Sequence, residues 1–158
     1  MRGLIWAGNL LGWPVIQLSG AWISQRLPTR LFEQDSWMTA PRRWESEGRI
    51  YREWLRIRRW KGLLPDGGAW FGGFEKKRIG SWDSAHLVEF LLETRRAEVA
   101  HWCMMLCLPV FFLWNPPWAC LVMAAYALAG NLPCIAAQRY NRIALERLLM
   151  RRREMRLQ

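Results

Sequence analysis

Apolar and charged residues are sharply segregated along the chain. Residues 3–24 carry no charge, and residues 99–138 carry none apart from the titratable His101. Nearly all the charged side chains fall in 25–98 and 139–158. The first apolar run is long enough to cross a hydrocarbon core of about 30 Å as a helix. The pattern predicts an all-α integral membrane protein made of one domain, 1–158.

The second apolar run is too long for one crossing. Asn115-Pro116-Pro117 interrupts it, because two successive prolines remove hydrogen-bond donors and clash with the preceding turn. The run therefore predicts a helical hairpin, with Val99–Trp114 and Trp118–Gln138 as its two arms. With the first run this gives about three transmembrane helices. The charged approach 86–98 extends the first arm as a cytoplasmic helix.

Polar residues within the first run indicate a helix that packs against others. Asn9, Pro14, Gln17 and Ser19 weaken it as a lone anchor, and polar or small residues mark helix contacts in lipid. A cleaved signal peptide is the alternative, which Arg2 and the apolar run allow. No small-x-small cleavage site follows, which favours a retained helix.

The basic residues predict the topology. Of 23 lysines and arginines, Arg2 alone precedes the first span, while 15 fall in 25–98 and seven in 139–158. The positive-inside rule places both charged segments in the cytoplasm and the N-terminus outside. We therefore expect a multi-pass protein of the cell membrane with a cytoplasmic active face.

The segment 41–64 has the pattern of an amphipathic helix. Apolar side chains recur at helical spacing with basic side chains mainly opposite: Ile50, Trp54 and Ile57 against Arg49, Arg52, Arg56 and Arg59. A helix of this type lies in the membrane interface beside anionic lipids. The segment therefore predicts an interfacial helix and membrane lipids as partners.

Charge and cysteine usage exclude other classes. The net charge of +10 is high enough for a nucleic-acid partner, but the basic residues flank apolar spans and form no soluble basic face. The four cysteines lie in the apolar stretch without CxxC spacing, and the two histidines form no HExxH motif. We therefore predict no nucleic-acid partner, no structural disulfide and no metal site.

A candidate catalytic pair lies where charge gives way to the second apolar run. In a helix, Glu98 and His101 are three residues apart on one face, with Arg95 one turn earlier. A carboxylate beside an imidazole orients it and raises its basicity. The alternative is interfacial solvation, with the long polar side chains reaching towards water. The other histidine, His86, has no partner motif and is interpreted as a surface or capping residue.

A second polar cluster, Gln138–Arg142, follows the last apolar arm and shares the predicted cytoplasmic surface. Arg139 and Arg142 are spaced to hold a phosphate or carboxylate through paired donors. The alternative is simple anchoring of a basic helix end at the membrane surface.

Three groups of residues resemble one family in order and spacing. They are Arg59-Trp60-Lys61 with Leu64-Pro65-Asp66-Gly67, Glu93–Glu98 with His101-Trp102, and Asn131-Leu132-Pro133 with Gln138–Arg142. Together they look like the glycosyl-diaponeurosporenoate acyltransferase family of staphyloxanthin synthesis. The likeness covers roughly residues 45–145.

The resemblance implies acyl transfer from a fatty acyl thioester to a sugar hydroxyl of a glycolipid or glycosylated isoprenoid. Acyl-CoA or acyl carrier protein would be the donor substrate, with no bound cofactor. His101 would be the general base and Glu98 its partner. The expected substrate-binding residues are Arg95, Arg96, Arg139, Asn141, Arg142 and Lys61.

Two alternatives stay open. Cys103 is a candidate nucleophile for an acyl-enzyme, although a thiol in an apolar helix has a raised pKa. A non-enzymatic membrane scaffold, or a subunit of a larger complex, explains the twelve tryptophans and the basic segments equally well. It does not explain why two chemically rich clusters share one surface.

Overall fold

A computed structural model describes residues 2–65 and 83–157 of the chain. Every regular element within these ranges is helical, which confirms the all-α prediction. The α-helices are α1 (Arg2–Arg26), α2 (Arg49–Glu53), α3 (Ser84–Leu106) and α4 (Pro117–Leu157). Short 3-10 turns connect them: η1 (Thr29–Phe32), η2 (Arg43–Gly48), η3 (Ile57–Arg59), η4 (Lys61–Leu63) and η6 (Leu108–Leu113).

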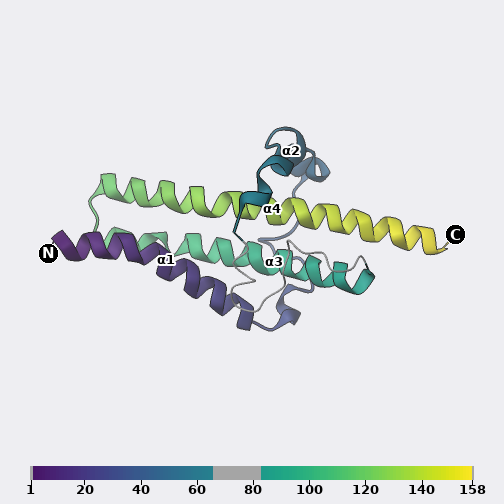
Figure 1. Ribbon diagram of the computed structural model, residues 1–158, viewed down its shortest axis with the longest axis horizontal. Helices are drawn as coiled ribbons and strands as arrows, with labels where there is room; N and C mark the ends of the chain where they lie inside the picture. The colour runs from purple at the N-terminus through teal and green to yellow at the C-terminus, as the bar shows by residue number, and fades with distance from the viewer. Residues whose placement is uncertain (1, 66–82, 158) are drawn as a thin grey trace.

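An antiparallel hairpin of α3 and α4 forms the axis of the molecule (Figure 1). The Asp83 side chain caps α3 by accepting a hydrogen bond from the backbone N–H of His86 at 2.7 Å. After α3 ends, η6 carries the chain to a reversal at Asn115 and Pro116. Pro117 then begins α4, where its missing N–H costs nothing.

Helix α4 does not end with its apolar run. It continues past Gln138 to Leu157, so the basic segment after Gln138 is part of the same helix. Arg, Leu, Met and Glu dominate this extension, and all four are strong helix formers. Pro133 lies within the helix without ending it.

Two helical segments are long and apolar enough to cross a membrane among the described residues. They are Ser84–Leu113 and Pro117–Leu157. Helix α1 is not one of them, so the predicted count of about three spans is not confirmed.

Helix α1 packs against the apolar end of the hairpin through polar, aromatic and small residues. The Asn9 side chain accepts from Trp114 Nε1 at 2.9 Å and exchanges hydrogen bonds with the Asn115 amide at 2.8 Å. Trp13 is buried and stacks on Phe111 with ring centroids 4.8 Å apart. Asn9 thus serves helix packing, as the sequence predicted.

The predicted interfacial helix over 41–64 is wrong as a continuous element. The segment is broken into η2, α2, η3 and η4. Ser46, Glu47 and Gly48 adopt left-handed backbone conformations, and Arg56 does so again eight residues later. These reversals separate the apolar stripe, since Ile57 is 0% exposed while Trp54 is 83% exposed. The segment folds over α4 instead of lying flat as one helix (Figure 1).

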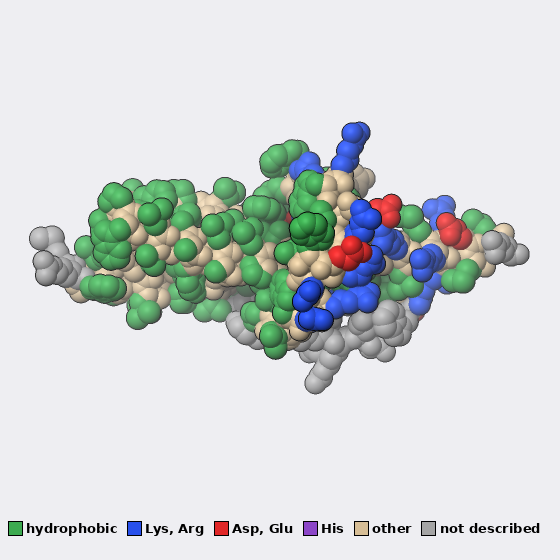
Figure 2. Space-filling model, turned by 90° about the horizontal axis from the view of Figure 1, so that it is seen from above, with side chains coloured by type: hydrophobic (Ala, Val, Ile, Leu, Met, Phe, Trp, Pro, Cys, Tyr) green, Lys and Arg blue, Asp and Glu red, His purple; other side chains and the backbone are tan. Residues whose placement is uncertain are grey.

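The face of the molecule in Figure 2 divides into an apolar half and a charged half. In Figure 2, hydrophobic side chains cover the end formed by α1, η6 and the start of α4, while charged ones gather over the middle and the C-terminal part of α4. The border between the halves falls where the two polar clusters of the sequence meet.

Candidate functional site

A buried network of charged side chains joins α3 to α4 at this border. The Glu98 carboxylate is 0% exposed and accepts from Arg139 Nε and Arg142 Nη1, each at 2.6 Å. Trp102 Nε1 adds a longer hydrogen bond at 3.4 Å. Both arginines are themselves buried. Because an isolated buried charge is costly, Glu98 and the two guanidinium groups depend on one another.

A second buried carboxylate, Glu45, comes from η2. It accepts from Arg139 Nη1 at 2.9 Å and from the hydroxyl of buried Tyr51. Burial, with Glu45 close by, raises the pKa of the Tyr51 hydroxyl well above its usual value. Arg139 also donates to the Met38 carbonyl at 2.6 Å, so all three of its nitrogens are engaged. The network therefore fixes Arg139 in one orientation.

His101 is held by an amide rather than by the predicted carboxylate. Its Nδ1 lies 2.9 Å from Oδ1 of Asn131, which is 0% exposed. The Asn131 amide nitrogen donates to the Ala127 carbonyl at 2.9 Å, which fixes Oδ1 as the atom facing the imidazole. Nδ1 then carries the proton, so Nε2 is the basic atom of the neutral ring. The expected partner Glu98 accepts from the two arginines and Trp102, so the contact that orients Nδ1 comes from Asn131.

Arg95 and Arg96 are buried and engaged inside the protein. Arg95 pairs with Asp35 at 2.8 Å and donates to backbone carbonyls of η1 and the residue after it. Arg96 pairs with Glu93 at 3.1 Å and donates to backbone carbonyls at the end of α1. These contacts brace the segment after α1 against α3. The predicted substrate-binding role of the two arginines is therefore not favoured by their geometry.

Lys61 and Asn141 are brought together from distant parts of the chain. Lys61 Nζ donates to Asn141 Oδ1 at 2.7 Å and lies 5.1 Å from the centroid of the Tyr140 ring. Burial lowers the pKa of the Lys61 ammonium, and the charge of Arg58 lowers it further. Two residues of separate sequence motifs thus meet on one face of α4.

A large apolar groove of about 910 Å³ opens beside the network. Trp102 and Leu106 of α3 and Leu132 and Ala136 of α4 form part of its wall, and the 37–60 segment contributes several aromatic side chains to it. Two arginines, Arg42 and Arg139, also line the mainly apolar groove, and Arg139 is the one whose guanidinium is fixed by the buried network. Such a cavity suits a ligand with a long apolar chain and a polar end.

The model of the glycosyl-4,4'-diaponeurosporenoate acyltransferase family matches residues 32–151. The chain belongs to this acyltransferase family. The buried network, His101, Asn131 and the groove all lie within the matched range, whereas α1 precedes it.

Curated relatives carry the name of the acyltransferase family. The chain is 32% identical to the glycosyl-4,4'-diaponeurosporenoate acyltransferase of Staphylococcus haemolyticus over 135 residues, or 85% of this chain and 78% of that relative. The enzyme of the same name from Staphylococcus aureus strain USA300 is 29% identical over 138 residues, covering 87% and 83%. No solved structure matches the chain. The two apolar helical segments and the family together indicate a membrane transferase.

Two functional candidates of this acyltransferase were missed by sequence reasoning. Asn131 was visible within a family motif, but nothing in its spacing linked it to His101 thirty residues earlier. Glu45 sits in a charged segment with no distinguishing signal, and its partner Arg139 is 94 residues away. Asp66 and Gly67 of the first family motif lie outside the described residues.

Proposed function

We propose that the protein is a membrane-bound O-acyltransferase that moves a fatty acyl group from a thioester donor to a sugar hydroxyl of a glycolipid or glycosylated isoprenoid. The donor is acyl-CoA or acyl carrier protein, and no bound cofactor takes part. Membership of the acyltransferase family supports the class of reaction. The observation that carries the proposal is an imidazole oriented by Asn131 on the residue next to Trp102, which lines a large apolar groove with the fixed guanidinium of Arg139 in its wall.

In the proposed reaction, His101 Nε2 takes the proton from the sugar hydroxyl as its oxygen attacks the thioester carbonyl carbon. A tetrahedral oxyanion forms, and a positively charged donor such as Arg139 stabilises it. The carbon–sulfur bond then breaks, and the departing thiolate receives the proton from the imidazolium. Asn131 keeps the ring in the tautomer that this sequence of proton transfers requires.

Arg139 is preferred to Arg142 for the oxyanion because it alone of the two lines the groove. Its Nε and both terminal nitrogens already donate to protein oxygens. A guanidinium has five N–H bonds, so two remain for a ligand. Glu98 and Glu45 thus act on the reaction through Arg139, as positioning residues.

A transfer assay tests the class of function. Membranes containing the protein, incubated with radiolabelled acyl-CoA or acyl carrier protein and a glycolipid extract, are expected to yield a labelled, alkali-labile glycolipid. Alkali cleaves an ester but leaves an amide, so the product identifies O-acylation. An unchanged lipid profile with both donors would instead support the scaffold interpretation.

Filling the groove tests where the acyl or isoprenoid chain lies. Ala136→Phe is expected to lower kcat/KM for a long-chain donor or acceptor by about tenfold while sparing short-chain analogues, because each displaced methylene loses up to about 0.8 kcal/mol of apolar burial. Ala129→Phe is the matched control on the exposed face of the same helix. Equal losses for both variants, or for both chain lengths, would contradict this placement.

We further propose three spans, with α1 as the first. Helix α1 has 25 residues and packs along the apolar end of the hairpin, which supports its insertion beside the other two. The N-terminus is then outside, and the segment between α1 and α3 is cytoplasmic together with the C-terminal end of α4.

Cysteine labelling tests this topology. Leu63→Cys, in a background whose four native cysteines are replaced, introduces a thiol at a side chain that is 85% exposed. A membrane-impermeant maleimide is expected to label it only after the cells are opened. Gly3→Cys, near the N-terminus, is expected to be labelled already in intact cells. Labelling of position 63 in intact cells would overturn the proposed orientation.

A further inference from the structure

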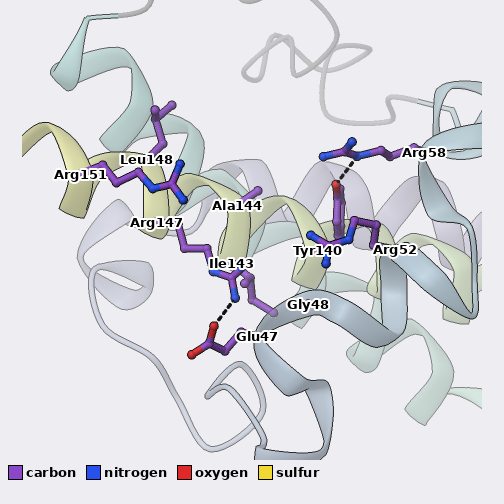
Figure 3. Close-up of a pocket in the computed structure, with 10 residues that line it drawn as sticks. All are labelled: Glu47, Gly48, Arg52, Arg58, Tyr140, Ile143, Ala144, Arg147, Leu148 and Arg151. Carbon is purple, nitrogen blue, oxygen red and sulfur yellow. Dashed lines mark hydrogen bonds and ion pairs between the residues drawn. The ribbon is translucent and has the colours of Figure 1, made fainter.

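A second hollow, separate from the apolar groove, lies on the charged half of the molecule. It has a volume of about 360 Å³ and is formed between α4 and the segment that contains Gly48, Arg52 and Arg58 (Figure 3). Its α4 wall includes Arg147 and Arg151. We call it the basic hollow, because four arginines and one glutamate line it.

The arginines of the basic hollow are incompletely paired. Arg147 Nη2 lies 2.6 Å from a carboxylate oxygen of Glu47, but both side chains are solvent-exposed. This ion pair therefore contributes little to the free energy of folding. Arg58 uses Nε to donate to the Tyr140 hydroxyl at 2.8 Å, and its two terminal nitrogens have no hydrogen-bond partner among the described residues. The Arg151 side chain is exposed and makes no hydrogen bond or ion pair with the described residues. The wall therefore holds excess positive charge and unused donors.

The shape of the basic hollow fits a ligand with several phosphate groups and a flat apolar part. Tyr140, Arg147 and Arg151 lie along one face of α4 over roughly 16 Å, from the helical rise per residue. Guanidinium groups bind phosphate oxygens through paired, planar donors. Between them, Ile143, Ala144 and Leu148 supply an apolar floor, against which a ring can pack.

The basic hollow and the apolar groove adjoin through consecutive residues of α4. Arg139 lines the groove, and Tyr140 lines the hollow. The segment folded over α4 contributes to both, with Tyr51 in the groove and Arg52 in the hollow. A long amphipathic molecule can therefore place its acyl chain in one cavity and its charged end in the other.

We propose that the basic hollow binds the phosphorylated nucleotide end of an acyl-CoA donor. This inference rests on the proposed acyl transfer and selects between its two donors. The 3'-phosphate and the pyrophosphate of CoA would meet Arg58, Arg147 and Arg151, and the adenine ring would cover the apolar floor. The pantetheine arm would then carry the thioester towards the groove.

Binding measured without turnover tests the proposal. The purified protein in nanodiscs of zwitterionic phosphatidylcholine is titrated with 3',5'-ADP and with CoA. Arg151→Gln and Arg58→Gln are each expected to weaken both ligands by about tenfold, the equivalent of one charge-assisted hydrogen bond. Arg151→Gln breaks no side-chain hydrogen bond or ion pair among the described residues, and Arg151 is exposed, so folding is expected to be unaffected.

Arg153→Gln is the matched control. It removes the same charge from the same helix two positions away, on the opposite side, and Arg153 is exposed outside the hollow. If Arg153→Gln weakened ligand binding as much as Arg151→Gln does, the attraction would be non-specific and the proposed binding site would be wrong. Failure of the wild-type protein to bind CoA or 3',5'-ADP would overturn it as well.

Two further experiments distinguish a CoA phosphate from a lipid phosphate and acyl-CoA from acyl carrier protein. If Arg151→Gln weakens binding to phosphatidylglycerol vesicles but leaves CoA binding unchanged, the hollow holds a lipid headgroup and the donor assignment is wrong. Transfer from acyl carrier protein but not from acyl-CoA would also overturn it. If CoA binds as expected but no lipid is acylated, the hollow stands and the proposed reaction fails.

Discussion

His101→Ala is expected to lower acyl transfer by about a hundredfold or more, because a general base contributes roughly 10²–10⁴-fold to a proton-transfer step. The imidazole is hydrogen-bonded to Asn131 and is only partly buried, whereas Glu98 pairs with Arg139 and Arg142, so removal of the imidazole is expected to leave the buried charged network in place. The measurement is initial rate against protein concentration, with the quantity of inserted protein determined separately. KM for both substrates is expected to change little.

The controls separate a base from a structural residue. His86→Ala, at the capped start of α3, is expected to leave turnover near that of the unmodified protein. Asn131→Leu keeps the volume but removes the group that fixes the tautomer, so it is expected to reduce kcat and alter the pH profile while His101 remains. Near-normal turnover of His101→Ala would refute the base assignment. Cys103→Ala would then test the exposed thiol of Cys103, which lies two residues after His101 in the same helix.

Apolar patterning predicted the all-helical class and the reversal of the hairpin, because both depend on short-range rules. The chain reverses at Asn115 and Pro116, and Pro117 begins the second arm of the hairpin. Asn9 of the first run proved to be a packing residue, since it pairs with Asn115 at the reversal. Each of these features follows from backbone chemistry or from the cost of an unpaired polar group in an apolar setting.

The candidate site was harder to predict because its contacts are long-range. Glu98 and His101 share a helix, which suggested that they pair with each other. In the fold, α4 offers Glu98 two guanidinium groups and offers the imidazole an amide. Spacing along one helix identifies neighbours on that helix, but it cannot reveal which partner from another helix binds more strongly.

The failed interfacial helix has a similar cause. Arginines and apolar residues alternate over 41–64 with helical spacing, yet Ser46 and Glu47 take left-handed conformations that neither residue type favours. These conformations place Glu45 where Arg139 and Tyr51 can reach it. The tertiary ion pair thus overrides the local pattern, and no local signal in the sequence indicates it.

Glu98→Gln is expected to destabilise the fold more than it changes the chemical step. The substitution keeps the shape of the side chain but leaves Arg139 and Arg142 buried without a carboxylate between them. Breaking a buried ion pair on one side typically costs about 3–5 kcal/mol. The expected result is a large fall in the midpoint of thermal unfolding in detergent, with a reduced yield of inserted protein.

Glu47→Gln is the matched control for this prediction. Glu47 also accepts from an arginine at 2.6 Å, but its side chain is 85% exposed, so its loss is expected to cost at most about 1 kcal/mol. Comparable unfolding midpoints for the two variants would contradict a structural role for Glu98. If Glu98→Gln folds normally but loses activity with the pH profile of Asn131→Leu, the carboxylate acts on His101 after all. The two measurements together therefore distinguish a residue that holds Arg139 in place from one that tunes the base.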